Sequence, residues 1–234
     1  MSSPSPLRLK ALATKLDRPW VPQLEQANIL IKGLSHICAL DQPEIVPDQP
    51  FVVEPCREDD IEDVDEGLER DGIDFLGQYA FNEKNETTVT LNMCRIRRLT
   101  TRHGFHFEDV VKIVLLHELA HFVTHRGKSL CPECWVAFEA ASSEQKESIA
   151  QQATHLYLRV AGYGQLVQVF HEVSHDCPLK YNDWMNKWKR STRGFAAESF
   201  KMALQQFRAE LFASRKKEWV PDKEDIHDMT GYDE

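Results

Sequence analysis

Two histidines and a glutamate in the segment His117-Glu118-Leu119-Ala120-His121 are spaced for metal-dependent hydrolysis. Side chains four residues apart lie on one side of an α-helix, because four steps of about 100° return to within about 40° of the starting direction. His117 and His121 could therefore bind one zinc ion, with Glu118 beside it to take a proton from a zinc-bound water. Such an arrangement is typical of metalloproteases. The alternative interpretation is a helix with incidental surface histidines.

The residues around this motif predict a helix over residues 107–126, FEDVVKIVLLHELAHFVTHR. Glu108 and Asp109 fall in its first turn and Arg126 in its last, the charge order that the helix dipole favours. Apolar residues at three- and four-residue spacing predict one buried face: Phe107, Val110, Val111, Val114, Leu115, Leu119, Phe122 and Val123. The metal-binding motif falls on the remaining side, together with His125.

A catalytic zinc usually has three protein ligands, so the two histidines require a third. His125 lies two helical turns from His117, about 12 Å along the axis, which is too far to share one ion. Cys131 and Cys134 follow an expected helix break at Gly127, but the catalytic zinc of peptidases seldom has thiolate ligands.

Glu147 is the preferred third ligand. Ser142 and Gln145 have the spacing of a capping box and predict the start of a second helix, for which Gly162 supplies a stop. An apolar stripe runs along this helix through Ile149, Ala153, Leu156 and Val160. Near the helix start, Glu147 could face the first helix across a cleft. The alternative interpretation is a carboxylate exposed to solvent.

An HExxH helix followed by a second helix bearing a glutamate resembles the gluzincin branch of the zincin metallopeptidases. Residues 147–154, ESIAQQAT, are similar to the Glu-Gly-Leu-Ala-Gln-x-x-Thr segment of a group of predicted metallopeptidases, in which the glutamate is taken as the third ligand. The resemblance covers about half of the chain, roughly residues 72–188. This chain departs from the pattern at Ser148, where glycine is usual, and at Gln151, where many gluzincins have an acidic partner.

The resemblance implies an α+β, zincin-like fold with a small, mostly antiparallel sheet, an HExxH active-site helix and a mainly helical C-terminal half. We expect an N-terminal helical extension over residues 1–50 and a zincin-like catalytic domain over residues 51–190. A helix over residues 191–219 would pack on the core, and residues 220–234 would form an acidic tail.

Local patterns predict the other elements. Strands are expected over residues 51–53, 78–81 and 87–93, the last two as a hairpin. Helices are expected over residues 7–16, 24–34, 165–175, 179–189 and 195–217. In zincins the sheet edge beside the metal helix receives the substrate as an added strand, so the resemblance makes the hairpin the expected substrate platform.

The implied reaction is hydrolysis of a protein or peptide substrate, in which Glu118 accepts the proton of a zinc-bound water and passes it to the leaving amine. The oxyanion needs a donor besides zinc, and Tyr157 and His155 are candidates for this transition-state stabiliser. Two alternatives remain open. One is a zinc-binding or regulatory protein on a zincin scaffold without turnover, and the other is hydrolysis of a non-peptide amide.

Six cysteines without a signal peptide argue against an extracellular disulfide framework. Cys131 and Cys134 could bind a second, structural zinc together with His175 and Cys177. A paired C-x-x-C…C-x-x-C pattern is absent, however, so reduced thiols in a loop beside the active site are the favoured interpretation.

Charge and hydropathy exclude some classes of partner. The net charge of −9 argues against binding to the nucleic-acid backbone. No apolar run approaches the roughly 18 residues of a membrane span, and the N-terminus lacks the apolar region of a secretory signal. A protein of the cytoplasm or nucleus, without membrane or nucleic-acid partners, is therefore expected.

Overall fold

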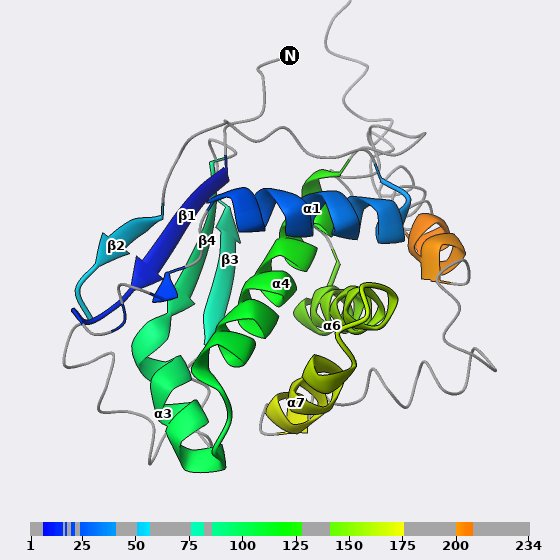
Figure 1. Cartoon of the computed structure of the whole chain (residues 1–234). Helices are drawn as coiled ribbons and strands as arrows, with labels where there is room; N and C mark the ends of the chain where they lie inside the picture. Colours follow the sequence, from blue (N-terminus) through cyan, green and yellow to red (C-terminus); the bar gives the residue numbers. More distant parts are fainter. Residues whose placement is uncertain are drawn as a thin grey trace, which may run out of the picture.

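The computed structural model describes residues 7–15, 17, 20–21, 24–40, 51–56, 76–81, 86–127, 141–175 and 200–207. These residues form a four-stranded sheet with helices packed against it (Figure 1). The α+β class expected from the sequence is confirmed. Among the described helices, none combines the length and the apolar character needed to cross a membrane.

The sheet is mixed. Its strands are β1 (Leu7–Leu12), β2 (Val52–Glu54), β3 (Gly77–Phe81) and β4 (Thr87–Asn92), in the order β2-β1-β4-β3 (Figure 1). The β3–β4 pair is antiparallel, as the predicted hairpin requires, but β1 pairs in parallel with both β2 and β4. The expectation of a mostly antiparallel sheet is therefore wrong, because the N-terminal segment adds parallel pairs that local patterns do not reveal.

Strand β1 replaces an expected helix. Leu7, Leu9 and Ala11 are buried, whereas Arg8 is exposed and Lys10 half-buried. This alternation has the two-residue period of a strand with one face on the core. The helix expected over residues 7–16 is wrong, and this part of the expected N-terminal helical extension belongs to the sheet.

Helix α4 (Phe107–Arg126) has the bounds expected from its sequence and lies at the centre of the fold. It packs against β3 and β4 on the sheet and against helices on its other sides (Figure 1). Those helices are α1 (Leu24–Cys38), α3 (Met93–His103), α6 (Ser143–Val160) and α7 (Gly164–His175). Most of α4 is buried, so its polar motif is held inside the fold.

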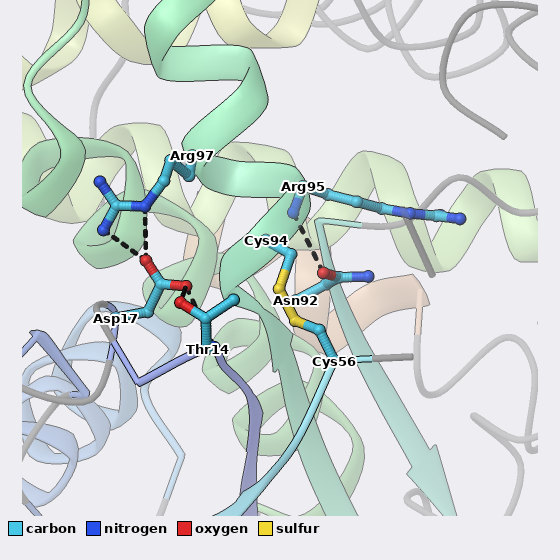
Figure 2. Close-up of a disulfide and its surroundings, with 7 residues drawn as sticks. All are labelled: Thr14, Asp17, Cys56, Asn92, Cys94, Arg95 and Arg97. Carbon is cyan, nitrogen blue, oxygen red and sulfur yellow. Dashed lines mark hydrogen bonds and ion pairs between the residues drawn. A yellow bond between two sulfur atoms is a disulfide. The ribbon is translucent and has the colours of Figure 1, made fainter. Parts of the chain in front are cut away.

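Helix α3 was not expected, because its sequence MCRIRRLTTRH is mostly polar. The Asn92 side chain caps its first turn by accepting a hydrogen bond from the backbone N–H of Arg95 (Figure 2). The helix ends at Gly104, whose φ of 70° favours glycine. A disulfide joins Cys94 in the first turn to Cys56 after β2 (Figure 2), a pair that cysteine spacing did not predict.

A buried carboxylate ties the end of β1 to α3. Asp17 accepts hydrogen bonds from the backbone N–H of Thr14 at 3.1 Å and from the Thr14 hydroxyl at 2.6 Å. It also forms an ion pair with Arg97 of α3 (Figure 2). The Arg97 guanidinium in turn lies 4.3 Å from the ring centroid of Phe107, the first residue of α4. This network fixes the start of α4 relative to the sheet.

Other expectations are confirmed or fall outside the described residues. Helix α1 contains the one expected over residues 24–34, and α7 matches the one expected over residues 165–175. Residues 200–207 are helical, within the expected helix over residues 195–217. The helix expected over residues 179–189 and the tail over residues 220–234 lie outside the described part of the chain.

Candidate metal centre

Helix α4 brings the two histidines of the motif together. His117 and His121 lie one turn apart, with their Nε2 atoms separated by 3.2 Å. Their rings are perpendicular, with centroids 4.8 Å apart. Both Nε2 atoms therefore point to the same place beside the helix.

Helix α6 brings Glu147 to the same place. The predicted capping box is present, because the Ser142 side chain accepts from the backbone N–H of Gln145 and the Gln145 side chain accepts from the backbone N–H of Ser142. Glu147 follows in the next turn, on the side of α6 that packs against α4. Its Oε2 lies 3.1 Å from Nε2 of His117, and its Oε1 lies 3.2 Å from Nε2 of His121.

These three residues could hold a metal ion. Two imidazole lone pairs cannot face each other at 3.2 Å without a proton or a cation between them. Tetrahedral ligands about 2.0–2.1 Å from a zinc ion lie about 3.3 Å from one another. The separations of 3.1 and 3.2 Å in the cluster of His117, His121 and Glu147 fit this geometry.

The histidines keep Glu147 ionised. Burial alone would raise the pKa of its carboxyl, but His121 and His117 lower that pKa well below its usual range. The cluster thus offers one negative charge and two imidazoles to a cation. A divalent ion bound there would keep a net positive charge and a Lewis-acid character.

Glu118 is buried beside the cluster, with 6 % of its surface exposed. Burial raises the pKa of its carboxyl to about 7, and nearby Glu147 adds to the rise. His117 and a hydrogen bond from the backbone N–H of Tyr79 act in the opposite direction. A carboxyl with a pKa near neutrality can both accept and release a proton, as a general base that later acts as an acid must do.

Residues of strand β3 also contact Glu118. A Cβ atom on Gly77 would lie 2.7 Å from Cγ and 2.8 Å from Oε1 of Glu118, so the glycine allows the close approach. Sequence reasoning missed both Gly77 and Tyr79 as parts of the site. Neither residue could be assigned to the site from the sequence. In the chain, α3 lies between the β3–β4 hairpin and α4, and the register of β3 against α4 cannot be derived from either segment alone.

His125 lies one turn beyond His121 and is not part of the cluster that could hold a metal ion. Its Nδ1 is 2.7 Å from the hydroxyl oxygen of Tyr79, and its side chain is buried. The structure thus gives His125 a partner on β3.

The two candidate transition-state stabilisers point to neighbouring helices. Tyr157 packs against Gly33 of α1, and its ring stacks with that of Tyr163 at 6.5 Å. The ring of His155 lies 5.1 Å from that of His171 on α7. Burial lowers the pKa of His155 to about 4, with His171 and Arg159 acting in the same direction, so its imidazole is neutral near pH 7. Both stay predictions as oxyanion donors.

The expected second zinc site also stays a prediction. Cys131, Cys134 and Cys177 lie outside the described residues, and His175 is the last residue of α7. Comparisons of the chain with protein-family models, with curated proteins and with solved structures found no match.

Proposed function

We propose that this protein is a zinc-dependent metallopeptidase with a zincin-like, gluzincin-type site. The observation that carries the proposal is the convergence of three side chains from two helices, whose nearest ligand atoms lie 3.1 and 3.2 Å apart, with a buried glutamate beside them. His117 and His121 on one helix and Glu147 on the next are the ligands, and Glu118 is the general base.

The donor set favours zinc. Two imidazole nitrogens and one carboxylate oxygen are the ligands of many hydrolytic zinc sites, which leave one position open. Zinc bound there would lower the pKa of a coordinated water to about 7 and polarise a substrate carbonyl.

The protein's own residues supply the proton transfers. Glu118, with a pKa near 7, accepts a proton from the attacking water and delivers it to the leaving amine. Gly77 and the backbone N–H of Tyr79 hold its carboxylate beside His117. The cost of burying this acid is offset by the packing of α4 in the core.

A peptide substrate fits the edge strand. Strand β3 pairs with β4 on one side and ends the sheet of the described residues on the other. It also packs against α4, which carries the site. We propose that an extended peptide binds along β3 as an added strand, so that its backbone is held by hydrogen bonds and one carbonyl reaches the metal.

The test is cleavage of a peptide library by zinc-loaded protein, with and without a chelator. We expect cleavage that the chelator stops and added zinc restores, and no cleavage by a Glu147→Ala variant, which lacks one ligand. A Glu172→Ala variant is the matched control, because it removes an exposed glutamate of α7. Peptides that stay intact in the presence of tightly bound zinc would refute the peptidase.

That negative result would favour a zinc-binding or regulatory protein without turnover. One observation supports this second candidate. Gln151, at the position where many gluzincins have an acidic partner, is buried and lies 3.4 Å from the hydroxyl of Ser174 through its Oε1. As a neutral amide, Gln151 supplies none of the negative charge that an acidic residue would bring at this position.

A further inference from the structure

We propose that Tyr79 and His125 form a positioning pair that locks strand β3 onto helix α4 and thereby fixes the orientation of His121 and Glu118. Both residues act through His121 and Glu118, so the role is positioning and not catalysis. The inference rests on the proposed function for its consequence, but its contacts are independent of it. Three of the contacts between Tyr79 and α4 carry the inference.

The first contact is a partly buried hydrogen bond. The Tyr79 hydroxyl oxygen lies 2.7 Å from Nδ1 of His125, whose side chain is 2 % exposed. Inside a protein such a bond is strong, and breaking it leaves a polar atom in an apolar surrounding. This bond therefore fixes where β3 lies along the last turns of α4.

The second contact is with a metal ligand. The Tyr79 ring lies nearly parallel to the His121 ring, at an interplanar angle of 9° and a centroid distance of 6.3 Å. The same ring meets His125 edge-on at 5.8 Å. Tyr79 therefore lies against two histidines that are one turn apart, and it restricts the rotation of the His121 imidazole.

The third contact is with the proposed general base. The backbone N–H of Tyr79 donates to the Glu118 carboxylate. Gly77 lies two residues earlier, on the same face of the strand, where a Cβ would lie 2.6 Å from Cγ1 of Val114 and 2.7 Å from Cγ of Glu118. The backbone of β3 therefore lies directly against α4. Any shift of β3 moves the backbone N–H of Tyr79, which donates to Glu118.

These contacts explain the third histidine of the helix. His117, His121 and His125 follow one another at four-residue spacing on one side of α4. His125 is one turn too far from His117 to share an ion with it. Instead, His125 binds Tyr79 on the strand that orients His121.

The experiment compares metal affinity among four single variants of the full chain and the double variant Tyr79→Phe/His125→Leu. Tyr79→Phe removes only the hydroxyl and keeps the ring and the backbone N–H, whereas His125→Leu removes the imidazole partner. His125→Asn keeps a polar atom close to the position of Nδ1. Tyr163→Phe is the matched control, because it removes the hydroxyl of an exposed tyrosine in the turn before α7.

The readouts are the zinc Kd, by competition with a chromophoric chelator, and the visible absorption of the Co²⁺ form. Loss of a partner that orients a ligand typically weakens metal binding about 10- to 100-fold. We expect a weakening of about 10-fold for Tyr79→Phe and for His125→Leu, with no further loss in the double variant. His125→Asn should retain most of the affinity, and Tyr163→Phe all of it.

Wild-type affinity and an unchanged Co²⁺ spectrum in both Tyr79→Phe and His125→Leu would overturn the inference, as would strictly additive losses. Neither readout needs turnover, so the two proposals can fail separately. Coupled losses of affinity in a protein that cleaves no peptide would end the peptidase proposal and leave the pair standing. Cleavage that is lost in Glu118→Gln but unaffected in Tyr79→Phe, at unchanged metal affinity, would do the reverse.

Discussion

The two buried carboxylates Asp17 and Glu118 have different partners. Asp17 is fully buried and has the Arg97 guanidinium, the Thr14 hydroxyl and a backbone N–H as partners. Glu118 is 6 % exposed and receives a backbone N–H, but a second carboxylate, Glu147, lies nearby.

We propose that this difference separates a structural carboxylate, Asp17, from a reactive one, Glu118. A buried charge is stable when a cation and hydrogen-bond donors surround it. A buried carboxyl with fewer partners has a pKa close to the ambient pH, which suits proton transfer and costs stability. Burial alone therefore does not distinguish the two carboxylates, whereas their partners do.

The largest expected effect tests the reactive side of this comparison. Replacing Glu118 with Gln keeps the shape of the side chain but removes the proton acceptor. We expect turnover to fall by about 10³-fold, with zinc content unchanged and the free energy of unfolding equal or higher. Steady-state kinetics, elemental analysis and urea unfolding measure the three quantities. Retained turnover would show that Glu118 is not the base.

The disulfide near Asp17 gives the next largest effect. Cys56 and Cys94 are 38 residues apart, and closing a loop of that length lowers the entropy of the unfolded chain. Reduction should therefore lower the free energy of unfolding by about 4 kcal/mol. Thermal unfolding with and without a reductant measures this, and a Cys56→Ala variant should show no response to the reductant. Zinc affinity should stay the same below the unfolding transition, since the disulfide lies outside the metal centre.

Removing the charge of Asp17 should lower stability and leave turnover unchanged, the opposite of the effect expected for Glu118→Gln. In Asp17→Asn the Arg97 ion pair is lost, which should cost about 2 kcal/mol of stability, while turnover per folded molecule stays at the wild-type level. Arg97 is partly exposed and can turn to solvent, which limits the cost. A variant with wild-type stability but reduced turnover would reverse the assignment of the two carboxylates.

The smallest expected effect is the pH dependence of stability that comes from the buried imidazole of His155. The folded-state pKa of His155 is about 4, below its ordinary value of 6.5, so in that interval the unfolded chain takes up a proton that the folded chain does not. Stability should thus fall as the pH falls, by about 1 kcal/mol from pH 7 to pH 5.5. A His155→Gln variant should show a flatter dependence of unfolding free energy on pH. An unchanged slope in this variant would show that His155 is not the source of the pH dependence.

The sequence was most informative where its signals were local. The bounds of α4, the capping box of α6 and the β3–β4 hairpin each depend on residues close together in the chain, and all are confirmed. The pairing of Glu147 with His117 could be predicted because both helices were recognised and because the ligand chemistry requires a third donor.

Features that depend on distant partners could not be predicted in this way. The alternation of Arg8 and Lys10 with apolar residues was present in the sequence, but only parallel pairing with β2 and β4 makes that segment a strand. Helix α3 buries few residues, so its apolar signal is weak. The contact between Tyr79 and His125 depends on a register set by the folded sheet.

The central position of β1 has a consequence for synthesis on the ribosome. The β3–β4 hairpin can form as soon as both strands have emerged, but β1 leaves the exit tunnel long before β4, its partner in the sheet. The sheet must therefore recruit a strand across a long stretch of chain, which makes folding slow and leaves β1 exposed in the meantime. Strands Leu7–Leu12 and Val52–Glu54 are then the segments that a holding chaperone would need to protect.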